Sequence, residues 1–67
     1  MYRVYRYDNG VLHKIPKYEC NTIEDCHTKI NKLRKIGWNS IQLVIVECLH
    51  TYSSRIVEIV NPVTTND

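Results

Sequence analysis

The sequence predicts an α+β fold in which one helix packs on a four-stranded, mostly antiparallel sheet, in the order ββαββ. Three observations predict it. The turn Asp8-Asn9-Gly10 separates two strand-like segments, an amphipathic segment with a helix cap follows Thr22, and two further strand-like segments reach Asn61. We therefore expect a single domain at residues 1–61 and a flexible C-terminal tail at residues 62–67.

Residues 2–7 and 11–19 flank the turn and predict a β-hairpin. Two registers are open, and a slip of one residue exchanges the two faces of the hairpin. A three-residue turn with a glycine bulge would join Tyr5 and Tyr7 to the helix side. We favour a two-residue type I′ loop, for which the facing pairs are Tyr7 with Leu12, Tyr5 with Lys14, Arg3 with Pro16, and Val4 with Ile15.

The favoured register sorts the hairpin residues into two faces. Val4, Val11 and Ile15 are expected to lie under the helix. The other face is aromatic and basic, and consists of Arg3, Tyr5, Tyr7, Leu12, Lys14 and Tyr18. Tyrosine pairs across strands stabilise an ordinary solvated sheet. Tyrosine and arginine are also enriched where proteins bind each other, so the same face is a candidate recognition surface.

The helix is expected to run from about Ile23 to Ile36. Thr22 is a suitable N-cap, and acidic residues follow it in the first turn. An apolar stripe and a basic stripe occupy opposite sides of the segment: Ile23, Cys26, Ile30 and Leu33 on one, Lys29, Lys32 and Lys35 on the other. Gly37 supplies the left-handed stop, after which Trp38 can pack back on the last turn.

The C-terminal third predicts a second hairpin. Residues 41–49 are apolar on both sides of a strand, residues 50–54 are polar and form the connection, and residues 55–60 make the last strand. Simple alternation puts Ile56 and Val60 on one face of that strand, and Val57 and Ile59 on the other. A chain of 67 residues has no second layer to cover the outer face, so we expect a symmetric homodimer formed through that face or through an edge strand.

Charge and composition limit the classes of function. The formal net charge is +2, and the basic residues concentrate in the first half: residues 1–35 carry eight Lys or Arg against four acids, residues 36–67 one against three. This bias is compatible with an anionic partner. There is no signal peptide, no apolar run of the ~20 residues that a membrane helix needs, and no glycosylation sequon. We expect a cytoplasmic protein.

The chain contains the residue types for metal binding or catalysis, but not the spacing. Cys20, Cys26, His27, Cys48 and His50 do not form the close ligand pairs of zinc sites. Cys48 with His50 lacks the third group and the oxyanion-forming loop of a nucleophilic site. We therefore expect buried thiols, no disulfide framework, no metal, no cofactor and no enzymatic activity.

The order of elements resembles that of β-grasp-like immunoglobulin-binding domains and ubiquitin-like folds, and no motif extends this likeness of layout to function. The chain has no alanine or phenylalanine, and Ile, Asn, Lys and Tyr make up 24 of 67 residues, which indicates AT-rich coding. In size and composition it resembles small accessory proteins of phages and mobile elements.

Two functions are therefore predicted. The first is a non-enzymatic interaction protein that binds and inhibits a host protein of the defence type, in the host cytoplasm, through the hairpin face or a strand edge. The alternative is binding of an anionic nucleotide or nucleic acid by the same surface, with tyrosines stacking on bases. The candidate binding residues for both are Arg3, Tyr5, Tyr7, Lys14, Tyr18, Lys32 and Lys35.

Overall fold

The computed structural model confirms the α+β fold. It describes residues 1–50 and 53–63, and at His50 it describes the backbone but not the side chain. Along the chain lie β1 (Tyr2–Asp8), β2 (Val11–Cys20), α1 (Ile23–Lys35), β3 (Gln42–His50) and β4 (Ser53–Val60). The last strand begins two residues earlier than expected. Residues 64–67 of the expected tail lie outside the described residues. Before them, the amide of Val63 donates a 2.8 Å hydrogen bond to the carbonyl oxygen of Asn39.

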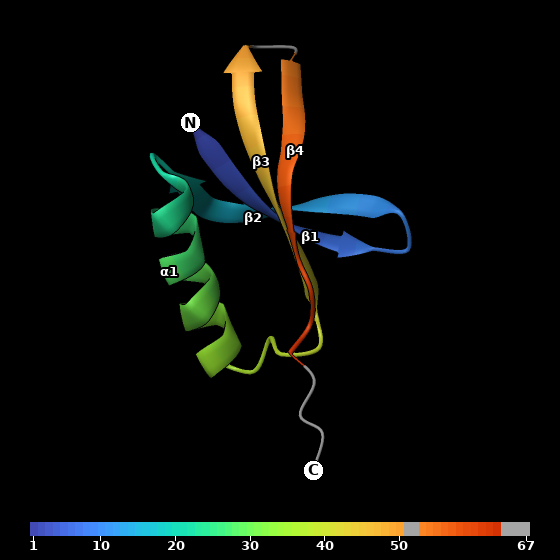
Figure 1. The fold of residues 1–67 in the computed structure, drawn as a ribbon. Coiled ribbons are helices and arrows are strands. Elements are labelled where there is room, and N and C mark those ends of the chain that lie inside the picture. Colours follow the sequence, from blue (N-terminus) through green and yellow to red (C-terminus); the bar gives the residue numbers. More distant parts are fainter. Residues whose placement is uncertain (51–52, 64–67) are drawn as a thin grey trace.

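The sheet has the order β2-β1-β3-β4, and every neighbouring pair is antiparallel. The two hairpins therefore meet through β1 and β3 at the centre, which leaves β2 and β4 as the edges. The helix lies on one side of the sheet, against β1, β2 and β3 (Figure 1). The opposite side of the sheet carries no further layer among the described elements.

The turn of the first hairpin has the favoured geometry. Asn9 and Gly10 have φ angles of 51° and 80°, as a type I′ loop requires, and Tyr7 lies opposite Leu12. Tyr5 lies opposite Lys14, also as predicted. The register near the turn is thus confirmed.

Further from the turn, the predicted register is wrong. Arg3 lies opposite Glu19, not opposite Pro16, because β2 contains a bulge between its pairings with Tyr5 and Arg3. Pro16 has no amide hydrogen for the ladder, and Lys17 has a φ of 67°, a left-handed conformation that interrupts the strand. The extra residues shift the alternation beyond this point.

The bulge changes the position of one predicted binding residue. Tyr18 does not share the face of Tyr5 and Tyr7; it is half-buried and packs with Ile15 against the core on the helix side. Val11 was expected under the helix but is exposed. The turn of the first hairpin projects away from the helix (Figure 1), so no part of α1 reaches over Val11.

Both ends of the helix form as the sequence predicts. The Thr22 side chain accepts a 3.1 Å hydrogen bond from the amide of Asp25, which caps the first turn. At the other end, the amide of Gly37 donates to the carbonyl oxygen of Arg34, and the amide of Trp38 donates to that of Leu33. These two hydrogen bonds define a Schellman motif. Gly37 has a φ of 110°, where a side chain is disfavoured.

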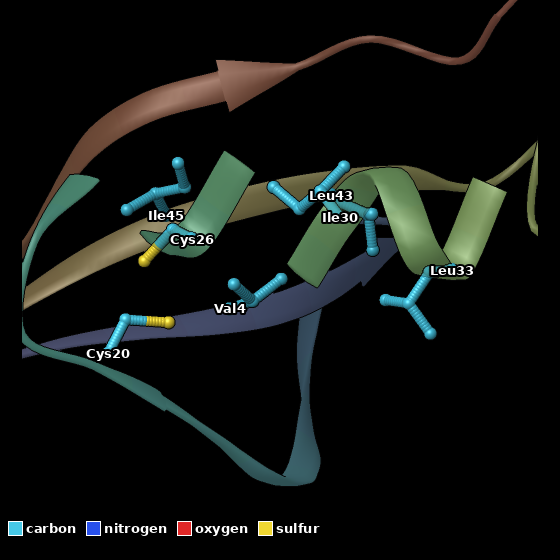
Figure 2. Packing of buried hydrophobic residues seen from close by; sticks show 7 residues of the cluster. All are labelled: Val4, Cys20, Cys26, Ile30, Leu33, Leu43 and Ile45. Carbon is cyan, nitrogen blue, oxygen red and sulfur yellow. The ribbon is translucent and has the colours of Figure 1, made fainter. Parts of the chain in front are cut away.

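The core lies between α1 and the two central strands. Figure 2 shows its buried side chains, which come from the helix stripe, from β1 and β3, and from the end of β2: Val4, Cys20, Cys26, Ile30, Leu33, Leu43 and Ile45. Ile15, Ile23 and Trp38 pack against this cluster and are partly buried. Apart from Val11, the predicted core is therefore confirmed, including the two buried thiols and the packing role of Trp38.

Candidate binding surface

The side of the sheet opposite the helix is the candidate binding surface, and we call it the open face. Partners in an antiparallel pair point to the same side, so the register assigns each strand's residues to a face. Tyr5, Val44 and Ile59 form one row across β1, β3 and β4. The open face comprises Arg3, Tyr5, Tyr7, Leu12, Lys14, Glu19, Gln42, Val44, Val46, Cys48, Ser54, Ile56 and Ile59.

The centre of the open face is covered by its own neighbours. Val44 and Val46 are 1% and 4% exposed although no second layer lies above them, because they sit between flanking residues of β1 and β4. The most exposed apolar side chains of this face belong to β4, where Ile56 and Ile59 are 50% and 56% exposed, and Leu12 of β2 is 39% exposed. The unpartnered apolar surface is therefore largest on the edge strand β4 and is not on β3.

The prediction from simple alternation, that Ile56 and Ile59 lie on different faces of β4, is wrong. Ile56 lies opposite Val46 and Ile59 opposite Val44, so both are on the open face, whereas simple alternation separates them. Val57 is the extra residue of a second bulge, between the pairs formed by Ile45 and Val46 of β3. The β4 segment contains no proline or glycine that would mark a bulge, and this bulge brings two isoleucines to one surface.

A shallow groove of about 310 Å³ crosses the open face between β1 and β4. Its lining is Tyr7, Gln42, Val44, Ile56 and Ile59. The floor and one wall are aliphatic, and Tyr7 and Gln42 add a ring, a hydroxyl and an amide. Such a groove suits an apolar side chain with a polar edge, and it offers no charged group to a small ion.

The charges of the open face are partly neutralised. Arg3 donates to a carboxylate oxygen of Glu19 over 2.8 Å, and its side chain is only 23% exposed. Lys14 is exposed beside Tyr5 and takes part in no ion pair among the described residues. Lys14 is therefore the main positive charge that the open face offers to a partner.

The seven predicted binding residues divide between two sides of the molecule. Arg3, Tyr5, Tyr7 and Lys14 lie on the open face. Tyr18, Lys32 and Lys35 belong to the helix side, the lysines as exposed residues of α1 and Tyr18 at the edge of the core. The aromatic and basic surface expected from the sequence is thus two surfaces.

Lys29 was expected on the outer stripe of the helix but turns toward the sheet. Its Nζ donates a 3.1 Å hydrogen bond to the carbonyl oxygen of Glu19 and lies 5.8 Å from the ring centroid of Tyr18. These two contacts of Lys29 connect α1 to the end of β2. The exposed basic stripe of α1 is reduced to Lys32 and Lys35.

Two of the three cysteines, Cys20 and Cys26, are core residues, and Cys48 is partly buried. Cys20 and Cys26 are 5% and 0% exposed, and all three cysteines are free thiols. Burial raises the pKa of Cys26 from its ordinary value of 9.0 to about 12, and a side-chain hydrogen bond with Cys20 adds to this. Within residues 1–50 and 53–63, no three His, Cys, Asp or Glu side chains lie close enough to hold a metal ion.

Comparison with known proteins gives no relative: no family model, no curated protein and no solved structure matches this chain. In the described part of the chain, no helix has the length and apolarity that crossing a bilayer requires.

Proposed function

We propose that this chain is a non-enzymatic interaction protein that binds another protein through its open face, with Tyr5 and Tyr7 at the centre of the contact. The observation that carries the proposal is the groove beside Tyr7, with exposed isoleucines on one side and Lys14 near the other. Tyrosines with solvent-exposed edges are frequent energetic centres of protein interfaces.

The geometry suits a protein partner better than a small molecule. The groove is shallow and lies on a rigid antiparallel sheet, so a partner can dock without a large conformational change. Its lining is aliphatic and aromatic, and the nearest basic residue on this face besides Lys14 is Arg3, which is already paired with Glu19. A partner with an apolar side chain for the groove and an acidic group for Lys14 fits this surface.

We assign the partner and the consequence of binding from size and composition. The partner is a host protein of the defence type, and the chain, encoded by a phage or mobile element, inhibits it stoichiometrically by occupying its surface. A chain of 67 residues that binds without turnover can act only in proportion to its amount. Inhibition by such a protein is therefore titratable and ends when the complex dissociates.

The alternative partner is an anionic nucleotide or nucleic acid. On the open face it would use Arg3, Tyr5, Tyr7 and Lys14. The other candidate residues, Tyr18, Lys32 and Lys35, are on the helix side and cannot join the same site. The open face therefore favours the protein partner, and salt dependence separates the two cases, since phosphate contacts weaken steeply with salt.

The experiment compares two double variants in a pull-down from host lysate, followed by reconstitution with the purified captured protein. Tyr5→Ser with Tyr7→Ser is expected to abolish binding. The matched control, Lys32→Gln with Lys35→Gln, changes the opposite side of the molecule and should leave binding unchanged. Each tyrosine contributes up to about 1 kcal/mol to the sheet through cross-strand pairing, so circular dichroism should show both variants folded.

Three outcomes contradict the proposal. Retained binding by the folded tyrosine variant would exclude the open face, and loss of binding in the lysine variant would move the site to α1. Capture of nucleic acid alone, with affinity that falls steeply between low and physiological salt, would favour the alternative.

A further inference from the structure

The two edges of the sheet differ in their protection against pairing with another strand. The β2 edge carries Pro16, two lysines at positions 14 and 17, and the bulge with its left-handed residue. These are the devices by which proteins prevent edge-to-edge association. In β4, by contrast, Ser53 to Val57 are exposed throughout, and the strand contains neither proline nor lysine. β4 also has a bulge, at Val57, but without a proline beside it.

The helix does not protect β4 either. It packs on β1, β2 and β3, and its link to β4 is a contact between Nε2 of His27 and a carboxylate oxygen of Glu58, which are 2.9 Å apart. Figure 1 shows β4 on the outside of the sheet, away from α1. The chain then leaves this edge, since Val63 is hydrogen bonded to Asn39, which precedes the start of β3.

The bulge in β4 places two opposite charges on one face. Arg55 lies opposite Glu47, and Glu58 lies opposite Ile45, and these two β3 residues are alternate positions on the helix side. In a regular strand, residues three apart point to opposite faces. Here the extra residue, Val57, restores them to the same face.

We propose that a second copy of this chain pairs antiparallel with β4, so that Arg55 lies opposite Glu58 of the partner subunit and the two sheets become one continuous eight-stranded sheet. This inference stands apart from the proposed function, because it concerns the strand edge and is measured with the chain alone.

The arrangement is reciprocal. A two-fold axis between Ile56 and Val57 brings Arg55 of each subunit opposite Glu58 of the other, so both ends of the strand pair are matched. In the same register, Ser54 lies opposite Ile59 of the partner subunit, and both belong to the open face. Without the bulge, this register would oppose residues of different faces, so the bulge is what makes the strand complementary to itself.

The two charges are available for such a contact. Arg55 donates to Glu47 over 3.0 Å, but its side chain is 70% exposed and can turn toward the edge. Glu58 is 40% exposed, with its second carboxylate oxygen left for a further donor. A single strand edge buries less than a standard interface, so the dissociation constant should be on the order of micromolar.

Charge reversal tests the register directly. In the proposed dimer, Arg55→Glu or Glu58→Arg alone turns both intersubunit pairs repulsive and should weaken the dimer about tenfold or more. An equimolar mixture of the two variants regains opposite charges at both positions and should form a heterodimer with nearly the wild-type dissociation constant. Sedimentation velocity from roughly 1 µM to 1 mM, with one variant carrying a mass tag, measures each species.

The mixing step protects the test from effects on folding, because mixing cannot change the stability of either monomer. The matched control reverses the other strand-to-strand ion pair, with Arg3→Glu and Glu19→Arg as separate variants; these should leave the dimer unchanged. A second variant, Val57→Pro, places a residue without an amide hydrogen beside the proposed two-fold axis, where the new strand pair would form, and should give a folded monomer.

Three results would overturn the inference. The first is a wild-type chain that stays monomeric over the whole concentration range. The second is a dimer that both single reversals leave intact. The third is a dimer that Tyr5→Ser with Tyr7→Ser dissociates while Val57→Pro does not, because that dimer would form through the open face.

Discussion

The guanidinium of Arg34 donates a 3.0 Å hydrogen bond to the carbonyl oxygen of Asn61, 27 residues further along the chain. The same side chain donates to the carbonyl oxygens of Trp38 and Ile41, the latter at 2.6 Å. Arg34 therefore joins the end of α1, the segment that leads into β3, and the end of β4. In the sequence it is only one more basic residue beside the lysine stripe.

Replacing Arg34 by Met should destabilise the fold by about 2 kcal/mol, because three carbonyl oxygens lose a charged donor in a half-buried position. Urea denaturation followed by circular dichroism measures this as a lower midpoint. Lys35→Met is the control, since Lys35 is exposed on the same turn, and it should change stability by less than about 0.5 kcal/mol. Equal effects of the two substitutions would show that the guanidinium contacts contribute nothing.

Gly37→Ala should cost about 1 kcal/mol. A Cβ at Gly37 would meet no atom within 4 Å, so the whole cost comes from the backbone at a φ of 110°. The chain is short enough for chemical synthesis, which allows D-alanine at the same position. D-alanine favours positive φ, so it should restore or exceed the wild-type midpoint. If the L and D forms are equally stable, the helix end is not held in the left-handed conformation.

Thiol-specific labelling of the native protein near neutral pH should modify Cys48 first. Cys48 is only partly buried, whereas Cys20 and Cys26 are inside the core. The raised pKa of Cys26, about 12, also keeps its thiol protonated and unreactive. Mass spectrometry after a short exposure should show one adduct, and labelling in denaturant should show three. Rapid modification of all three in the native state would contradict the buried positions of Cys20 and Cys26.

Stability should decrease at alkaline pH in a way that depends on Cys26. Its thiol ionises near 9.0 when exposed in the unfolded chain but only near 12 when folded, so between these values the unfolded state gains the charge first. The stabilisation that the buried, protonated Cys26 thiol gives to the folded state is complete below about pH 9 and is lost progressively toward pH 12. Tyrosines and lysines also titrate in this range, so the measurement compares thermal melts of wild type and Cys26→Ala at each pH. The difference between them should narrow as pH rises; a constant difference would contradict the assignment.

The ends of the helix and the first turn could be predicted from the sequence because they depend on neighbours. Thr22 caps an amide three residues away, and the stop at Gly37 uses carbonyl groups of the preceding turn. Asn9 and Gly10 likewise determine their own loop and, with it, the pairing of Tyr5 with Lys14. These interactions are complete within a few residues, so each is visible in a short stretch of sequence.

The faces further along the strands could not be predicted, because they depend on bulges. The extra residues in β2 move Tyr18 to the helix side, and the extra Val57 brings Ile56 and Ile59 together. A bulge is defined by two residues of one strand opposing one residue of its partner, so its position depends on the pairing of the two strands. Pro16 marks the bulge of β2 in the sequence, but it does not give the number of extra residues, and β4 has no such mark. Arg3, Tyr5, Tyr7 and Lys14 therefore share a face, whereas Tyr18 lies on the helix side. Lys32 and Lys35 lie on α1 itself.

The sequence by itself determined the elements, their order and the apolar stripe that forms the core, because periodicity and local hydrogen bonding are properties of contiguous segments. Only the tertiary structure decided that β3 pairs with β1, that Arg34 reaches Asn61, and that β4 rather than β3 exposes the unpartnered apolar surface. These features arise from contacts between distant residues, whose partners are selected by the packing of the whole chain.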